Sequence, residues 1–459
     1  MRTIWLWGLS AVLTGCGAGE VDYSTLKSAA EARQRQAGMS DPATQRSVRE
    51  LLGRPLDAQA ASQLALLNNR GVRALAEELN IAKANLARVR RLPNPTLQGA
   101  LRFHSGERAE IDLGAMLSIT DLLFLASRTG AAQGSVQAAQ LSALSNVLGL
   151  SFEARRAFFA YQSALQTLEL RRTVAAAFAA STDAAQRLRD AGNTTELALA
   201  NEKSALAEAR VALQRSEVMA AGARERLNAI MGLSGPATQW HADARLPDLP
   251  QTEVELKALE SEAIRRSLDL EVAKQRFAAA AKRSNVARAT GFIPELKAGV
   301  SAERKENWGI GPAVEVEVPL FYQGQGEVGV AEAERRQQEN VYADTAVRIR
   351  ASARTAAAEL TAARDRVMYS RDVVLPLKQK VVEETQLQYN AMLIGVFQLL
   401  QARREQIETG ARYIAELREY WVARSNVEEL LAGRLGERAL GSQGLTDAAT
   451  SAEPAMMEH

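Results

Sequence analysis

Cysteine and histidine, two residue types that carry much of enzyme chemistry, are scarce in this sequence and widely spaced. The chain of 459 residues contains one cysteine, Cys16, and three histidines, His104, His241 and His459. One cysteine forms neither an internal disulfide nor a cysteine-based zinc or iron–sulfur site. Residues 324–329 fit the pattern G-x-G-x-x-G, but the strand–helix context of a nucleotide fold is missing around them, so the pattern alone is weak. We therefore expect no enzyme activity.

The one reaction that the sequence favours is acylation of a thiol. An apolar run over 4–13 is too short to span a bilayer and is typical of a secretory signal. Leu13-Thr14-Gly15-Cys16 then resembles a bacterial lipobox, in which small residues precede a cysteine that becomes lipidated. We expect 1–15 to be a signal peptide of the lipoprotein type, Cys16 to carry lipid, and 16–59 to form an N-terminal lipidated segment.

The charge balance and the hydropathy of the chain limit which partners it binds and how it could cross a membrane. Lys and Arg number 56 against 54 Asp and Glu, and this near balance argues against a nucleic-acid partner. Gly17 follows the cysteine in place of an aspartate, which favours the outer membrane over the inner one. The sequence has no run of 18 apolar residues, so a crossing of the membrane would require strands that close into a barrel.

Similar patterns recur in the two halves of the chain, which indicates an internal duplication. The leucine heptads that begin at Leu199 recur from Leu400, at an offset of 201 residues (400 − 199). Pro95-Thr96-Leu97 matches Pro294-Glu295-Leu296 at an offset of 199 (294 − 95). We expect a first repeat over 60–233, a linker over 234–253, a second repeat over 254–433 and a flexible tail over 434–459.

Each repeat is expected to contain a helix, two strands and a long helical hairpin. The strands are expected over 96–103 and 110–120, and over 295–304 and 310–319. These lengths are close to the 9–11 residues of a tilted membrane-spanning strand. The hairpin tips are expected near 190–195 and 392–396. Pro376 is expected to kink the long helix of the second repeat, where the first repeat has Ala175.

Alternation in the last strand suggests where these strands lie. Val314, Val316 and Val318 share one face, and Glu315 and Glu317 share the other. A buried sheet would leave two carboxylates without partners, whereas a water-filled barrel lumen would solvate them. A sheet with its glutamate face in solvent is the alternative.

The strand count indicates a shared barrel. Four strands do not close a barrel, so several chains must each contribute four, and three chains give twelve strands around a polar lumen. We therefore expect a mainly α fold with a small β part, in which a trimeric 12-stranded outer-membrane β-barrel continues into a long periplasmic α-helical coiled-coil barrel.

Several motifs together resemble the TolC-like outer-membrane factors, the outer membrane efflux proteins, over almost the whole chain. They are the lipobox, Leu92-Pro93-Asn94-Pro95 before the first strand pair, Pro312 and Val318-Pro319-Leu320-Phe321 in and after the second, and the tip sequences of 191–197 and 389–402. The second tip, with Tyr420-Trp421 downstream, is most similar to the CzcC-like heavy-metal efflux branch.

This resemblance implies a passive exit duct, a homotrimer that needs no cofactor. Its tips would dock onto a periplasmic adaptor (membrane fusion) protein that links it to an inner-membrane RND-type transporter, and the cargo would be heavy-metal cations. Gly192, Asn193 and Gly395 lie at the implied docking tips, and the two glycines are expected at equivalent points of the reversals. Gln398 and Gln401 lie at the implied pore gate, where many members of the family have acidic residues.

Two alternatives remain open. The same channel could export organic drugs or secreted peptides, since nothing in the lumen-facing residues decides the cargo. A non-transporting periplasmic coiled-coil lipoprotein scaffold is the other, and the strand pairs argue against it.

Overall fold

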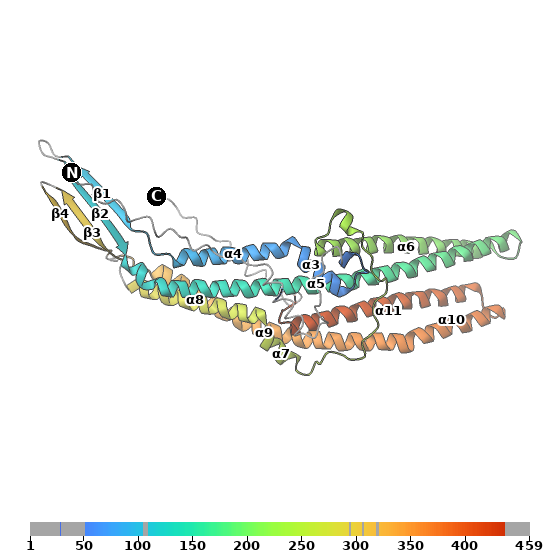
Figure 1. The fold of residues 1–459 in the computed structure, drawn as a ribbon. Helices are drawn as coiled ribbons and strands as arrows, with labels where there is room; N and C mark the ends of the chain where they lie inside the picture. Colours follow the sequence, from blue (N-terminus) through green and yellow to red (C-terminus); the bar gives the residue numbers. More distant parts are fainter. Residues whose placement is uncertain are drawn as a thin grey trace. The chain divides into compact units, whose positions relative to one another are not determined.

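The protein is mainly helical and carries one small sheet, as Figure 1 shows. The computed structural model describes residues 28, 51–103, 109–292, 295–304, 307–317 and 321–436. The expected signal peptide, Cys16 and nearly all of the expected tail lie outside the described residues. The chain divides into two compact units. The first includes 74–144 and 268–347, and the second includes 145–267 and 348–436.

The first unit contains the sheet and the helices next to it in sequence. Its elements are most of α4 (Arg70–Arg90), β1 (Thr96–Arg102), β2 (Glu110–Ser118), the start of α5 (Ile119–Asp190), α8 (Leu268–Phe292), β3 (Leu296–Arg304), β4 (Trp308–Val316) and the start of α9 (Gln325–Tyr369). Within its described part, each strand lies within two residues of the bounds expected from the sequence, apart from the C-terminal end of the last one. Residues 318 and 319 of that expected strand lie outside the described residues.

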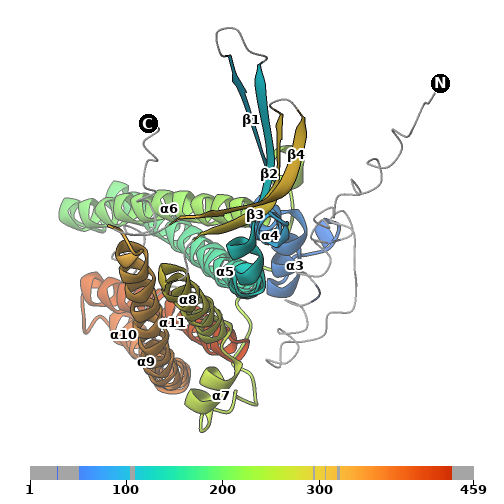
Figure 2. The same cartoon turned by 90° about the vertical axis from the view of Figure 1, so that its left-hand side faces the viewer.

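The four strands form one antiparallel sheet in the order β1-β2-β3-β4 (Figure 2). Lys297 pairs with Glu315 between β3 and β4, and Ala298 pairs with Val314 one step along. Because successive side chains of a strand point to opposite faces, this pairing separates polar from apolar residues across the sheet.

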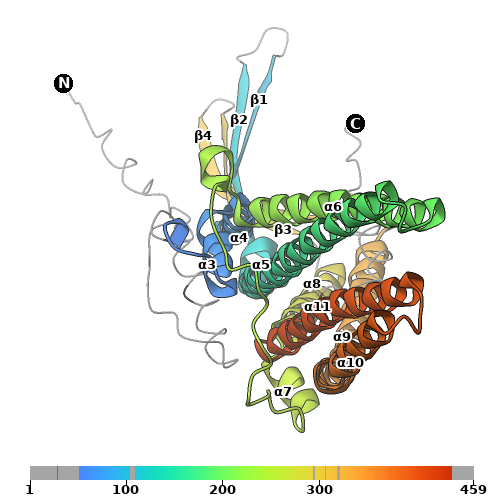
Figure 3. The same ribbon diagram turned by 90° about the vertical axis from the view of Figure 1, so that its right-hand side faces the viewer.

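The second unit consists of helices. Its elements are α3 (Ala58–Asn68), the rest of α5, α6 (Glu196–Met231), the short helix η1 (Gly235–Thr238), α7 (Leu259–Arg266), the rest of α9, the π-helix η2 (Ser370–Val374), α10 (Leu375–Asn390) and α11 (Val396–Leu431). Figure 3 shows α5 with α6, and α10 with α11, as two antiparallel hairpins. Within the described residues, no helix has the long apolar stretch needed to cross a membrane.

A π turn interrupts the long helix of the second repeat where a kink was expected at Pro376. The Leu375 N–H donates to the Ser370 carbonyl, five residues back, and Pro376 follows directly. Proline has no N–H to donate and its ring crowds the carbonyl four residues earlier, so an ordinary α-helical turn is disfavoured here. In the first repeat, α5 passes Ala175 without interruption.

The π turn also marks a change of alignment between the repeats. Before it, four buried positions match at an offset of 199; they are Ala154, Ala157, Tyr161 and Leu168 in α5, and Ala353, Ala356, Leu360 and Val367 in α9. After it, α5 and α10 end at Asp190 and Asn390, an offset of 200 (390 − 190). The π turn therefore accommodates the one extra residue of the second repeat. The offset of 201 expected from the heptads is one too large at the tips, and it holds only where Gly232 and Gly433 follow α6 and α11.

The inter-repeat linker is held against the second repeat by a partly buried ionic cluster. The Glu253 carboxylate accepts from Tyr420 Oη at 2.7 Å, Arg424 Nη1 at 2.9 Å and Arg364 Nη1 at 3.2 Å. Trp421 Nε1 donates to the Pro247 carbonyl at 2.9 Å. The Tyr420-Trp421 pair, which carried part of the resemblance, thus fixes the linker to α11.

Candidate functional site

The polar face of the sheet carries ion pairs between neighbouring strands. Lys297 Nζ lies 3.1 Å from Glu315 Oε1, and Arg102 Nη2 lies 3.3 Å from Asp112 Oδ2. Glu315 is therefore on the polar face of β4. Glu317 lies just beyond the strand, where its N–H donates to the Glu295 carbonyl at 3.0 Å and its side chain is exposed.

The opposite face is apolar and open. It presents Leu97, Leu101, Leu113, Val300, Trp308, Ile310, Val314 and Val316, each about half exposed or more, and Leu97 is 80% exposed. An apolar surface of this extent on a protein marks a contact with another protein or with lipid. The sheet is therefore two-faced, polar on one side and apolar on the other.

The first hairpin tip has a glycine-terminated helix end. The five residues 191–195 connect α5 to α6. Gly192 has φ +76°, its N–H donates to the Arg189 carbonyl at 2.9 Å, and the Asn193 N–H donates to the Leu188 carbonyl at 2.8 Å. This is a Schellman motif, in which a residue in the left-handed region terminates the helix and glycine is the preferred residue.

The second tip has the same reversal with a different residue at its critical position. The five residues 391–395 connect α10 to α11. The Met392 N–H donates to the Tyr389 carbonyl at 2.9 Å and the Leu393 N–H to the Gln388 carbonyl at 3.0 Å, the same pattern as at the first tip. Met392 has φ +62° and is the non-glycine residue with positive φ in the described part of the chain.

The expected equivalence of Gly192 and Gly395 is therefore wrong. Gly395 has φ −81° and ψ 166°, is the N-cap of α11, and corresponds to Thr195, the N-cap of α6. The two connections have equal length, so no insertion separates the tips. Matching glycine with glycine in the sequence placed Gly395 three residues away from the reversal position that Met392 occupies.

The predicted gate residues lie on one exposed face of α11. Gln398 and Gln401 are both exposed, and Gln401 Nε2 donates to Glu405 Oε1 at 2.9 Å. Lys378 Nζ lies 2.7 Å from the other oxygen of Glu405, and this hydrogen bond lowers the pKa of the Glu405 carboxyl. Glu405 was missed in the sequence, although its spacing of four residues from Gln401 on a helix places the two together.

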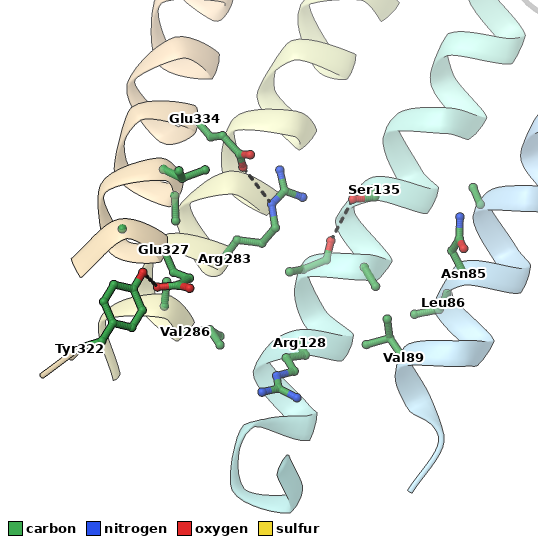
Figure 4. A pocket seen from close by; sticks show the side chains of 17 residues that line it. Asn85, Leu86, Val89, Arg128, Ser135, Arg283, Val286, Tyr322, Glu327 and Glu334 are labelled. Atoms are coloured by element: carbon green, nitrogen blue, oxygen red, sulfur yellow. Dashed lines mark hydrogen bonds and ion pairs between the residues drawn. The ribbon is translucent and has the colours of Figure 1, made fainter. Parts of the chain in front are cut away.

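A cleft of about 860 Å³ opens among α4, α5, α8 and α9 of the first unit (Figure 4). Its lining is mostly aliphatic, including Leu86 and Val89, and Arg283 lies 3.7 Å from Glu334 within it. The Tyr322 hydroxyl donates to Glu327, and this hydrogen bond raises the pKa of the tyrosine and lowers that of the glutamate.

The G-x-G-x-x-G pattern has a packing role beside this cleft. A Cβ on Gly326 would lie 2.6 Å from the Tyr322 hydroxyl, so the glycine makes room for the tyrosine. Across the described residues, no group of three His, Cys, Asp or Glu side chains is placed to hold a metal ion.

No model of a protein family matches the chain. Its sequence is 24% identical over 400 residues to the cobalt-zinc-cadmium resistance protein CzcC of Cupriavidus metallidurans, covering 83% of this chain and 91% of that protein. A membrane protein from Pseudomonas aeruginosa has a similar structure, with a TM-score of 0.69, 19% identity, and coverage of 85% of this chain and 98% of that one. The CmeC outer membrane channel of Campylobacter jejuni gives a TM-score of 0.72 at 12% identity, covering 83% and 86%. The resemblance drawn from the sequence is confirmed: this chain has the fold of the TolC-like outer-membrane efflux channels and is similar in sequence to CzcC.

Proposed function

We propose that this protein is the outer-membrane channel of a tripartite efflux system, a passive duct that exports heavy-metal cations. The channel is a homotrimer, its hairpin tips dock onto a periplasmic adaptor, and the adaptor links it to an inner-membrane RND-type pump. The observation that carries this proposal is the two-faced four-stranded sheet, joined in sequence to two long helical hairpins.

The sheet supports a shared barrel because one of its faces is apolar and the other polar, and because its two edge strands lack partners in the part of the chain that the structure describes. In a barrel, the apolar face with Leu97 and Ile310 meets lipid, and the polar face with Lys297 and Glu315 lines the lumen. The outer edges of β1 and β4 have no strand partner within the described residues, and unpaired backbone groups at a lipid-exposed edge are strongly unfavourable. Three copies that pair edge to edge satisfy these groups and give twelve strands.

The cargo and the anchor are argued from the sequence. The similarity to a cobalt-zinc-cadmium resistance protein supports divalent metal cations over organic compounds. The lipobox supports lipid attachment at Cys16, which would fix the protein to the outer membrane together with the barrel.

The proposal is tested by export and by assembly. In a strain that lacks the gene, the wild-type gene should restore tolerance to zinc, cobalt or cadmium and lower the cellular content of that metal. The detergent-extracted protein should be a trimer by native mass spectrometry. Restored tolerance to organic compounds but not to metals would favour the alternative cargo, and a monomer that remains in the periplasmic fraction would favour the scaffold.

A further inference from the structure

The two hairpin tips share one backbone path but differ in how that path is stabilised. At the first tip, glycine occupies the left-handed position, the Thr195 side chain accepts from the Ala198 N–H at 3.2 Å, and Arg189 pairs with Glu196 across the connection at 3.1 Å. Each of these features is a known local stabiliser of a helix end. Local interactions within the first tip therefore stabilise its backbone path.

The second tip lacks all three features. Met392 takes the left-handed position, which is unfavourable for any residue with a Cβ. Gly395 caps α11 without a side-chain hydrogen bond. Tyr389 and Val396 stand where Arg189 and Glu196 form their ion pair. A Cβ on Gly395 would meet only the flexible end of Gln398, at 3.2 Å, so the backbone there does not require glycine.

The second tip instead exposes large apolar side chains. Met392 is 92% exposed and Leu393 75%, and Tyr389 beside them is 38% exposed. A Schellman motif usually packs an apolar residue such as Leu393 against the third- or fourth-last helical residue. Here the third-last residue is Gln388, and Leu387 before it is 62% exposed, so Leu393 stays open. We call Tyr389, Met392 and Leu393 the second-tip patch.

The two tips also differ in charge, and the second tip is the less polar one. Residues 387–402 carry no charged side chain, whereas the corresponding residues 187–202 carry five; they are Arg187, Arg189, Asp190, Glu196 and Glu202. An uncharged surface with exposed methionine and leucine fits an apolar partner, and methionine is a side chain that adapts readily to such a partner. Local strain retained beside an exposed apolar patch is typical of a functional contact.

From these differences we infer that the second-tip patch is the apolar anchor by which the channel holds its adaptor. The partner surface is an uncharged apolar pocket on the adaptor that receives Met392 and Leu393. This inference rests on the proposed function, and it adds which of the two tips supplies the apolar contact and which side chains make it. The strain at Met392 is retained because glycine at that position would offer no side chain to the pocket.

The test separates binding from folding. The variant Met392→Gly/Leu393→Asn gives the second tip the residues of the first tip at the same two positions. It should raise or leave unchanged the thermal midpoint of the trimer, because the strain is relieved, while it weakens binding to the periplasmic adaptor of the proposed efflux system at least tenfold. Met392→Ala, which keeps the strained backbone but shortens the side chain, should also weaken binding. Biolayer interferometry with trimers in nanodiscs measures the affinity, and calorimetry measures the midpoint.

Met219→Asn is the matched control, because Met219 is a 69% exposed methionine in the interior of α6. It should change affinity less than twofold. Equal affinity of the wild type and Met392→Gly/Leu393→Asn would overturn the inference while leaving the proposed function intact. A loss of trimer in that variant with unchanged affinity would show that the patch joins copies of this chain instead. Wild-type trimers that bind no adaptor would contradict the proposed function itself, and the inference with it.

Discussion

Gly192 and Met392 occupy the same position of the same helix reversal, with φ of +76° and +62°. The hydrogen bonds around them run between corresponding residues at an offset of 200. Gly192 adopts this backbone conformation without strain, whereas Met392 adopts it at an energetic cost because it has a Cβ. The pair therefore offers a direct comparison of one backbone conformation with and without a side chain.

Exchanging these two residues should move stability in opposite directions. Met392→Gly should stabilise the helical hairpin by about 1 kcal/mol, because it removes the left-handed strain of a residue with a Cβ. Gly192→Met should destabilise its hairpin by about the same amount, although the space around it is open. Chemical denaturation of the detergent-solubilised protein measures both, and shifts of the same sign would contradict the assignment of strain.

Neighbouring positions of β4 should differ in their access to water. In a Cys16→Ser background, cysteine at Glu315 should react with a membrane-impermeant thiol reagent, because Glu315 lies on the polar face. Cysteine at Val314 should be shielded by lipid. Mass spectrometry of labelled outer membranes measures both, and the reverse pattern would place the apolar face toward the lumen.

Lipid attachment should depend on one atom, the Sγ of Cys16. Cells grown with a radioactive fatty acid should label the wild-type protein and not Cys16→Ser. Trimer formation should survive this substitution, because in the proposed assembly the barrel is itself an anchor. Label on the substituted protein would contradict lipidation at this residue, which lies outside the described part of the structure.

The linker cluster should make stability fall at alkaline pH. Burial and the hydrogen bond to Glu253 raise the pKa of Tyr420 to about 12. Because the folded pKa lies above the unfolded value of about 10, the contribution is fully present below pH 10 and is lost as the pH rises toward 12. The loss is about 2–3 kcal/mol over this range.

Tyr420→Phe tests this pH dependence. The variant should be less stable by about 1 kcal/mol at pH 8, because Glu253 loses one of its three donors. Between pH 10 and 12 its stability should fall less steeply than that of the wild type. Thermal unfolding across this range measures the slopes, and parallel slopes would show that Tyr420 is not the titrating group.

The strand period was the most informative part of the sequence. Apolar and polar residues alternate along the last strand, as at Val314 and Glu315. Because successive side chains of a strand point to opposite faces, the sequence alone predicts which residues share a face. The G-x-G-x-x-G pattern of residues 324–329 lacks the sequence context of a nucleotide fold. The structure gives Gly326 a packing role instead, because this residue makes room for Tyr322.

The tips were harder to predict because a sequence comparison matches residue types, whereas a reversal is defined by its hydrogen bonds. Nothing in a methionine signals a left-handed backbone, so Met392 was passed over in favour of Gly395. The change of offset between strands and heptads was visible in the sequence, but the π turn that accommodates part of it depends on a hydrogen bond between Leu375 and Ser370.

The π turn before Pro376 has a consequence for protein engineering. One extra residue in an unbroken α-helix would rotate every later side chain by about 100° around the helix axis. The wider turn absorbs that rotation locally, so Leu199 and Leu399 are both buried three residues into their helices. The segments 175–231 and 375–431 therefore have equal length and the same helical phase at their tips. A chimera that carries the first segment in both places should keep its helical phase, provided that its junction falls after Val374.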